Sequence, residues 1–187
     1  MLFRSLEQPT PTVAPLSRWQ RLDRRLFAWL GAGHRPQPIA LAVAKAVARW
    51  SWVPLVGLML SVGQNNGAGL WVLAQCLLAA GLVQVASKRL SRRMGFGRPF
   101  MEGLSPNHLQ HSHRSGFPST HATVMGTVFG FMLLHMPSSP ALAGMAAILV
   151  ATGWARVYVG AHFPLDVLAG LALGCVCGTF FAAALLV

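Results

Sequence analysis

The sequence predicts an all-α integral membrane protein, a bundle of about five spanning helices preceded by a helix that lies in the membrane interface. Of the 187 residues, 54% are hydrophobic and only 10% are charged, and the mean hydropathy is +0.53. A soluble domain carries about 25% charged residues. Each of five apolar runs is close to the ~20 residues that cross a bilayer as a helix. The runs cover about residues 38–62, 68–86, 120–136, 139–158 and 163–187.

The first of these runs is the least regular. Lys45 and Arg49 interrupt it, and Pro54 is expected to kink the helix because proline removes a backbone N–H and crowds the preceding turn. Its boundaries are therefore the least well defined.

The N-terminal segment divides into a flexible tail at 1–17 and an amphipathic helix. The tail is rich in Pro, Thr and Ser and has no apolar core after its first basic residue, so no cleavable signal peptide is expected. From Arg18 onward, apolar residues recur at helical spacing while arginines fill the other face. Two tryptophans and four arginines ahead of a span favour an interfacial helix over a cytosolic one. Residues 18–187 are thus predicted to form one membrane-embedded domain.

The charge balance is strongly positive, with 15 Lys and Arg against 4 Asp and Glu, or +11 with histidine neutral. Because these charges flank membrane spans, anionic lipid head groups and a phosphate-bearing substrate are the expected partners, and nucleic acid is not. The three cysteines lie inside apolar runs, where they are expected to be buried thiols, and neither a disulfide nor a metal site follows from them.

The long polar loop at 87–118 separates the second and third runs. Loops of this length are usually functional. Because successive spans alternate in direction, this loop, the N-terminal helix and the turn at 157–162 are expected on one face of the membrane. That face collects Arg98, the segment 118–121, Arg156, His162 and Asp166. Any one of these groups could be an interfacial anchor, but their convergence favours a site.

The spacing of His162 and Asp166 suggests a nucleophile with an orienting partner. Pro164 suits the first turn of a helix, which places His162 just ahead of the last span and Asp166 inside its first turn. A carboxylate there can accept a hydrogen bond from one imidazole nitrogen and leave the other free to attack.

The segment 118–121 opens another helix, whose first N–H groups and dipole provide an anion site. Ser119 can add a hydroxyl donor and is also expected to cap the helix. Arg98 and Arg156 supply planar, permanently charged guanidinium groups that hold phosphate oxygens in fixed geometry.

Three segments resemble, in order and spacing, the signature motifs of the type 2 phosphatidic acid phosphatase (PAP2) family. The best resemblance within it is to short bacterial undecaprenyl-diphosphate phosphatases of the bacitracin-resistance type. The similarity covers roughly residues 20–187. The segments are Gly97-Arg98-Pro99-Phe100, Phe117-Pro118-Ser119-Thr120-His121-Ala122 and the run from Ala155 to Asp166.

The resemblance implies a role for each matching residue. His162 would be the nucleophile that forms a phosphohistidine, oriented by Asp166. His121 would be the general acid that protonates the leaving group and later helps to activate water. The phosphoryl group would be held by Arg98, Ser119 and Arg156, and Thr120 is a further candidate.

The chain departs from the family pattern at three positions. Ser91 stands where the first motif usually has a lysine, so Lys88 or Arg92 is the candidate replacement. Thr120 replaces the usual glycine before the second-motif histidine. Ala155 replaces the usual serine before Arg156, which removes one phosphate donor.

The resemblance implies an enzyme that needs neither metal nor other cofactor. Fixed arginines and helix N-termini can stabilise the transition state of phosphoryl transfer. The alternative is a metal site at His108, His111 and His113, although a solvated loop is the simpler interpretation. The expected reaction is hydrolysis of undecaprenyl diphosphate to undecaprenyl phosphate and inorganic phosphate.

Other functions remain open from the sequence. One alternative is a broader lipid phosphatase or phosphotransferase acting on phosphatidic acid, phosphatidylglycerol phosphate or lipid A. Another is a small transporter or assembly factor without enzymatic activity. The expected location is the bacterial inner membrane. The resemblance places the active site in the periplasm, whereas the positive-inside rule would place the same face in the cytoplasm.

Overall fold

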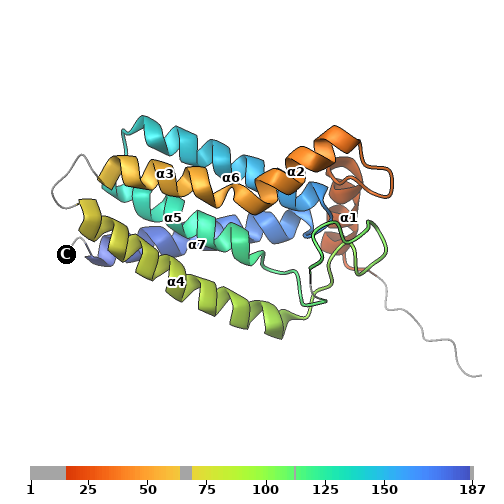
Figure 1. Ribbon diagram of the computed structural model, residues 1–187. Helices are drawn as coiled ribbons and strands as arrows, with labels where there is room; N and C mark the ends of the chain where they lie inside the picture. Colours follow the sequence, from red (N-terminus) through yellow and green to blue (C-terminus); the bar gives the residue numbers. More distant parts are fainter. Residues whose placement is uncertain (1–15, 64–68, 112, 186–187) are drawn as a thin grey trace, which may run out of the picture.

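The computed structural model describes residues 16–63, 69–111 and 113–185, and within these ranges the chain is all-α, as predicted. The helices lie in a bundle with one helix across its end (Figure 1). The tail predicted at 1–17 falls almost entirely outside the described residues. The helices are α1 Arg18–Leu30, α2 Pro38–Trp50, α3 Trp52–Gly63, α4 Gly69–Met94, α5 Thr120–His135, α6 Pro140–Tyr158 and α7 Pro164–Leu185.

Three of the described helices, α4, α6 and α7, are long and apolar enough to cross a membrane. A fourth span results if α2 and the first part of α3 count as one bent span. α5 has 16 residues, or roughly 24 Å at 1.5 Å per residue, which is shorter than the ~30 Å hydrocarbon core. By length and composition the described residues therefore provide three or four spans where the sequence predicted about five.

The first predicted run is bent, as expected. α2 ends and α3 begins around Ser51, and the two segments meet at 49°. Pro54 lies in the first turn of α3 and has no N–H to offer to the carbonyl of Trp50, so the hydrogen-bond ladder is interrupted there.

α4 is longer than predicted and continues to Met94, so Lys88 and Arg92 lie on this helix and not in a loop. Ser87 and Ser91 face the bundle and are 2% and 8% exposed. Arg92 and Arg93 lie in the last turn of the helix, where the helix dipole favours cations. The loop between spans is accordingly the shorter segment 95–119.

The contact between α5 and α7 is the most extensive helix pairing in the bundle. It depends on glycines spaced four residues apart on each helix. A Cβ at Gly174 would clash with the carbonyl oxygen of Thr123, and one at Gly170 would lie 2.7 Å from that of Ser119. Small residues at this spacing let helix backbones approach closely. The glycines are Gly126 and Gly130 on α5, and Gly170, Gly174 and Gly178 on α7.

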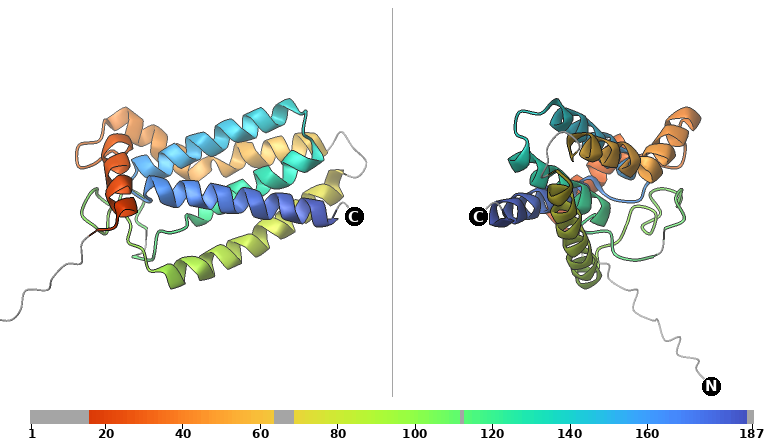
Figure 2. Two further views of the ribbon diagram at one scale, coloured as in Figure 1. Left: turned by 180° about the vertical axis from the view of Figure 1, so that it is seen from behind. Right: turned by 60° about the vertical axis from the view of Figure 1, so that its left-hand side comes forward.

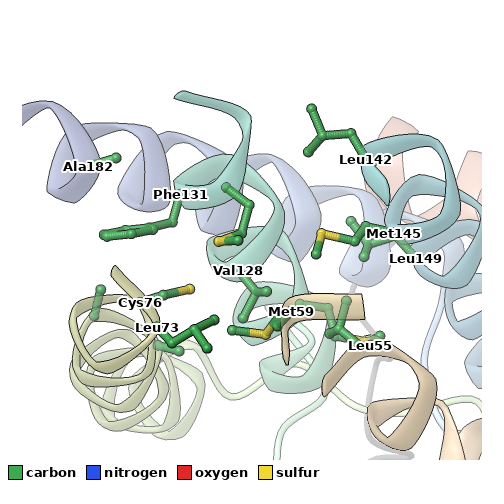
Figure 3. Close-up of a cluster of buried hydrophobic side chains, with 14 residues drawn as sticks. Leu55, Met59, Leu73, Cys76, Val128, Phe131, Leu142, Met145, Leu149 and Ala182 are labelled. Atoms are coloured by element: carbon green, nitrogen blue, oxygen red, sulfur yellow. The ribbon is translucent and has the colours of Figure 1, made fainter. Parts of the chain in front are cut away.

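A hydrophobic cluster fills the interior of the bundle between α3, α4, α5 and α6, with Ala182 of α7 (Figure 3). Its most buried members are Cys76, Phe131, Met145 and Ala182, each 0% exposed. Cys76 is thus a buried thiol, as predicted, and all three cysteines are free, with Cys175 and Cys177 half-buried.

α1 lies across the end of the bundle (Figure 2) and contacts two of the segments that carry predicted site residues. Phe27 packs edge-on against Phe163, with ring centroids 5.6 Å apart. Asp23 Oδ1 accepts a hydrogen bond of 2.9 Å from the backbone N–H of Leu165. Arg24 forms a 2.7 Å ion pair with Glu102 in the loop. α1 therefore braces both the loop and the start of α7.

The outer side of α1 agrees with the predicted interfacial helix. Trp19 and Trp29 are 71% and 91% exposed. Tryptophan is enriched at the level of lipid head groups, where an apolar ring with one polar N–H is well solvated.

We expect Gly174→Ala to destabilise the bundle by ~1–3 kcal/mol or more, because a methyl group must displace the α5 backbone. Thermal unfolding in detergent micelles measures this change. Gly81→Ala on α4 is the matched control, because a Cβ there meets nothing within 4 Å, and alanine is the better helix former. Equal melting temperatures for the two variants would contradict the close-contact interpretation.

We expect Asp23→Ala to lower stability by about 1 kcal/mol, because the Leu165 N–H loses its acceptor. Asp23→Asn retains an acceptor oxygen. Burial raises the pKa of Asp23 to about 6, with Asp166 and Glu102 adding to the effect and the Leu165 hydrogen bond opposing it. Because the folded pKa exceeds the unfolded value of 3.8, the stability linked to protonated Asp23 is lost as the pH rises through about 6. The free energy of unfolding of Asp23→Asn should therefore rise relative to that of the wild type between pH 5 and pH 8. A difference in stability that does not change with pH would refute this.

Candidate functional site

The predicted site residues meet at one end of the bundle, where the 95–119 loop, the start of α5 and the α6–α7 turn come together (Figure 1). A cavity of about 440 Å³ opens there. Two of the predicted residues, Ser119 and Asp166, lie behind its wall and are 0% and 4% exposed. The predicted residues that line it are Lys88, Arg92, Arg98, Thr120, His121, Arg156 and His162.

His162 is held by the α6–α7 turn. Gly160 adopts a φ of 73°, a left-handed conformation that favours glycine. The N–H groups of Ala161 and His162 both donate to the carbonyl of Arg156, at 3.1 and 3.3 Å. α7 then begins at Pro164, as predicted. The turn thus fixes the backbone of His162 directly ahead of the helix.

The imidazole of His162 is oriented by a backbone carbonyl. Its Nδ1 lies 2.9 Å from the oxygen of Gly116. Because a carbonyl can only accept, Nδ1 carries the proton and Nε2 keeps a free lone pair. Burial, together with the positive charges of Arg98 and Arg156, holds the pKa of His162 well below the ordinary 6.5. A neutral ring with a free Nε2 is the form that can act as a nucleophile.

Asp166 differs from its expected placement. Its Oδ2 lies 3.7 Å from Nδ1 of His162, beyond hydrogen-bond distance. The same oxygen accepts a 2.9 Å hydrogen bond from the N–H of Phe163. Asp166 therefore stabilises the first turn of α7 and places a carboxylate near the imidazole, while Gly116 provides the direct acceptor.

Arg98 is fixed by backbone carbonyls on two segments. Its Nε donates to Arg114 at 2.9 Å, and its Nη2 and Nη1 reach Ser115 and Ala161 at 3.4 Å. Gly116 lies between the side chains of Arg98 and Asp166, where a Cβ would be 3.0 and 3.1 Å from them. A side chain at residue 116 would therefore require Arg98 or Asp166 to shift by a few tenths of an ångström.

Arg156 is a buried cation, 2% exposed. Its Nη1 lies 3.1 Å from Nε2 of His111. Its Nε and Nη2 are buried without a partner. A buried charge with unsatisfied donors is unfavourable in the absence of a ligand, so these two atoms indicate a place for an anion.

Ser119 occupies the N-cap position of α5, but its side chain makes no capping hydrogen bond, contrary to expectation. Its hydroxyl is buried without a partner. The backbone N–H of Ser119 instead donates to the carbonyl of Asp166 at 3.0 Å and ties the start of α5 to α7. Among the described residues the hydroxyl therefore has no hydrogen-bond partner.

His121 lies in the first turn of α5 and is exposed to the cavity that His162 also lines. Thr120 lines the same cavity one residue earlier. The helix start therefore presents a second imidazole to whatever occupies the space in front of His162.

Ser91 stands where the first motif of the family usually has a lysine, and its side chain holds the loop in place. Ser91 donates a 3.1 Å hydrogen bond to the carbonyl of Ser115 and so anchors the loop to α4. Lys88 and Arg92 flank it and both line the cavity, so the geometry leaves both as candidates for the lysine's role.

The three loop histidines have different surroundings. His111 contacts Arg156, and His113 packs edge-on against Phe100 with centroids 5.7 Å apart. Nε2 of His108 is buried without a partner. Across the described ranges, no three His, Cys, Asp or Glu residues lie close enough together to hold a metal ion.

Two functional features were missed in the sequence. His111 is half-buried and bonded to Arg156, whereas a solvated loop was the simpler expectation for it. Gly116 supplies the acceptor for His162 through its backbone. No spacing signal distinguishes His111 from its neighbours, and a carbonyl group has no sequence signature.

Sequence comparison places these features in a known family. Residues 69–186 match the family model of the PAP2 superfamily. YbjG of Escherichia coli (strain K12), which carries a provisional undecaprenyl-diphosphatase name, is 33% identical over 162 residues, covering 83% of this chain and 78% of that protein. An undecaprenyl-diphosphatase of Sulfolobus acidocaldarius is 32% identical over 126 residues, covering 66% of this chain and 58% of the relative.

Two solved structures share the fold. The PAP2-type phosphatidylglycerolphosphate phosphatase of Bacillus subtilis superposes with a TM-score of 0.68 at 22% identity, covering 90% of this chain and 87% of the other. LpxE of Aquifex aeolicus gives 0.68 at 24% identity, covering 86% and 94%. On the family match and the extent of these similarities, the chain belongs to the PAP2 superfamily.

Proposed function

We propose that this protein is a membrane lipid phosphatase that hydrolyses undecaprenyl diphosphate to undecaprenyl phosphate and inorganic phosphate. The observation that carries the proposal is the shape of the cavity in front of His162. It joins a polar end, lined by the histidines and arginines, to an apolar stretch between α3, α4 and α5. The apolar stretch includes Leu55, Val56, Met59, Leu77, Val124 and Val128.

The two ends of the cavity match the two parts of a lipid phosphate. Buried guanidinium groups and helix N-termini favour the phosphate, and the aliphatic side chains favour a hydrocarbon chain. A lipid would reach His162 from the bilayer with its chain between the helices. A substrate without a chain would leave the apolar stretch exposed to water.

The first chemical step in this proposal is attack by His162. Its Nε2 lone pair forms a bond to the terminal phosphorus while the anhydride P–O bond breaks. The bond electrons go to the bridging oxygen, which His121 protonates, and undecaprenyl phosphate leaves. Arg98, Arg156 and the Ser119 hydroxyl hold the equatorial oxygens, on which charge accumulates.

The second step regenerates the enzyme. A water molecule gives a proton to His121, and its oxygen bonds to the phosphorus of the phosphohistidine. The P–N bond breaks, its electrons return to Nε2 of His162, and inorganic phosphate leaves. The hydrogen bond from Nδ1 to Gly116 keeps the imidazole in one orientation through both steps. This scheme uses no metal or other cofactor.

The runner-up is a broader lipid phosphatase, and a specific observation favours it. Lipid A 1-phosphatases of Rhizobium johnstonii and Rhizobium etli are 42% and 41% identical to this chain over 64 residues. That segment is 34% of the chain. The similarity to YbjG extends over 83% of the chain, so we favour undecaprenyl diphosphate as the substrate.

For the location we propose the bacterial inner membrane, with the cavity open to the periplasm. The arginines of α1, the loop cations and the turn before α7 share one end of the bundle, so the positive-inside rule alone would argue for the cytoplasm. We favour the periplasm because several of these cations have other roles. Arg98 and Arg156 line the cavity, and α1 can meet anionic lipid head groups.

Phosphate release by the purified protein tests the activity. In excess chelator, the wild type should release phosphate from undecaprenyl diphosphate faster than from phosphatidic acid, phosphatidylglycerol phosphate or lipid A, and vanadate should inhibit it. His162→Ala should reduce turnover by a factor on the order of 10³ or more, because the nucleophile is lost. His121→Ala should reduce it ~10²- to 10⁴-fold. His135→Ala, at the far end of α5, is the matched control.

Wild-type rates in folded His162→Ala protein would refute the assignment. Activity lost in chelator and restored by one divalent ion would refute metal independence. A faster reaction with another lipid would move the substrate to the runner-up.

Thiol labelling tests the orientation. With Cys76, Cys175 and Cys177 changed to Ala, Met101→Cys places a thiol in the loop, where Met101 is 41% exposed. We expect it to react with a membrane-impermeant reagent applied from the periplasm. Ser138→Cys, exposed between α5 and α6, should react only after the membrane is opened. The reverse pattern would show that the site faces the cytoplasm.

A further inference from the structure

The guanidinium of Arg156 has no acidic partner in the part of the chain that the structure describes. None of the acidic residues in the described ranges, Asp23, Glu102 and Asp166, forms an ion pair with it. Among the described residues, its one hydrogen-bond contact through the side chain is the 3.1 Å approach of Nη1 to His111 Nε2. Nε and Nη2 are buried and unpaired. The orientation of this cation therefore depends on a histidine.

His111 is itself held in place by a closed turn. Nδ2 of Asn107 donates to the carbonyl of His111 at 2.8 Å, and the N–H of His111 donates to Oδ1 of Asn107 at 2.9 Å. Gln110 has a φ of 53° within this turn, and its N–H reaches the carbonyl of Asn107 at 3.3 Å. The Asn107 side chain thus binds both backbone polar groups of His111 and fixes the position of the His111 backbone, from which the imidazole extends.

The protonation state of His111 follows from its partner. A guanidinium can only donate, so Nε2 of His111 must accept and the ring proton lies on Nδ1. Burial lowers the pKa of His111 to about 4, and the positive charges of Arg156 and Arg98 act in the same direction. The ring is therefore neutral at ordinary pH, and the contact with Arg156 is attractive.

We propose that His111 is a positioning residue that holds Arg156 through Nη1, so that Nε and Nη2 remain directed to the oxygens of a bound phosphoryl group. A guanidinium is planar and rigid, so fixing one nitrogen fixes the directions of the other two. Asn107 contributes to this positioning indirectly, because its side chain holds the backbone of His111. The inference deepens the proposed function and rests on it for the identity of the anion.

Anion binding tests this role separately from lipid turnover. The dissociation constant of orthovanadate would be measured at pH 7.5 by calorimetry in detergent, beside kcat and KM for undecaprenyl diphosphate. His111→Ala should weaken vanadate binding about 10- to 100-fold, the range expected when a hydrogen bond to a charged group is lost. His111→Gln, whose Oε1 can accept from Nη1, should restore most of the affinity.

Two more variants separate positioning from general loop stability. Asn107→Ala frees the turn without touching either ring, and it should weaken vanadate binding less than His111→Ala does. His113→Ala, an exposed histidine two residues away, should bind vanadate as the wild type does. The melting temperature of each variant shows whether it is folded. If His111→Ala does not fold, vanadate binding by His111→Gln and Asn107→Ala tests the role of His111.

The outcomes distinguish the two ideas. If folded His111→Ala binds vanadate as tightly as the wild type, or if Gln rescues nothing, the positioning role is wrong while the proposed function stands. If the wild type binds vanadate but turns over no lipid phosphate, the proposed function is wrong and the loss in His111→Ala still supports the role of His111. If the wild type binds no vanadate, the anion site itself is wrong and both ideas fall.

Discussion

The close backbone contact between α5 and α7 is the constraint on which the rest of the structure depends. Glycines at Gly126, Gly130, Gly170 and Gly174 allow these helices to approach more closely than any side chain would permit. A lipid environment offers little hydrophobic drive for helix association, so close packing of this kind carries much of the stability. Because α5 begins after Ser119 and α7 after Phe163, the same contact brings the start of α5 beside the turn that holds His162.

The site end of the bundle holds more positive charge than its own acidic groups can balance. Arg98 and Arg156 are held by carbonyls and by a neutral imidazole, and Asp166 is the one carboxylate beside them in the described residues. Oriented cations with unsatisfied N–H groups need no reorganisation when an anion arrives. Burial and the same positive charges keep His162 neutral, so the groups that would bind phosphate would also keep its Nε2 lone pair free to attack.

α1 links this arrangement to the membrane surface. Its tryptophans face outward, while Asp23, Arg24 and Phe27 contact the start of α7 and the loop. α1 therefore supports both the start of α7 and the loop that carries Arg98. The apolar stretch of the cavity runs from the same end of the bundle into its interior between α3, α4 and α5, which fits a substrate that never leaves the bilayer.

The sequence alone determined the all-α class, the helix starts at Thr120 and Pro164, and the bend in the first run, because apolar length, proline placement and helix-start residues act locally. It also determined the family, through motifs whose residues recur at fixed spacing. The roles assigned to His162, His121 and the arginines stay predictions that rest on that resemblance.

Only the tertiary structure decided which groups touch. The acceptor for His162 is the carbonyl of Gly116, not Asp166, and the partner of Arg156 is His111, 45 positions earlier in the chain. The sequence could not give these contacts, because a carbonyl exists at every residue and a loop histidine has no periodicity. Both contacts join the 95–119 loop to the segment from the end of α6 to the start of α7, so they depend on how segments far apart in the sequence pack together.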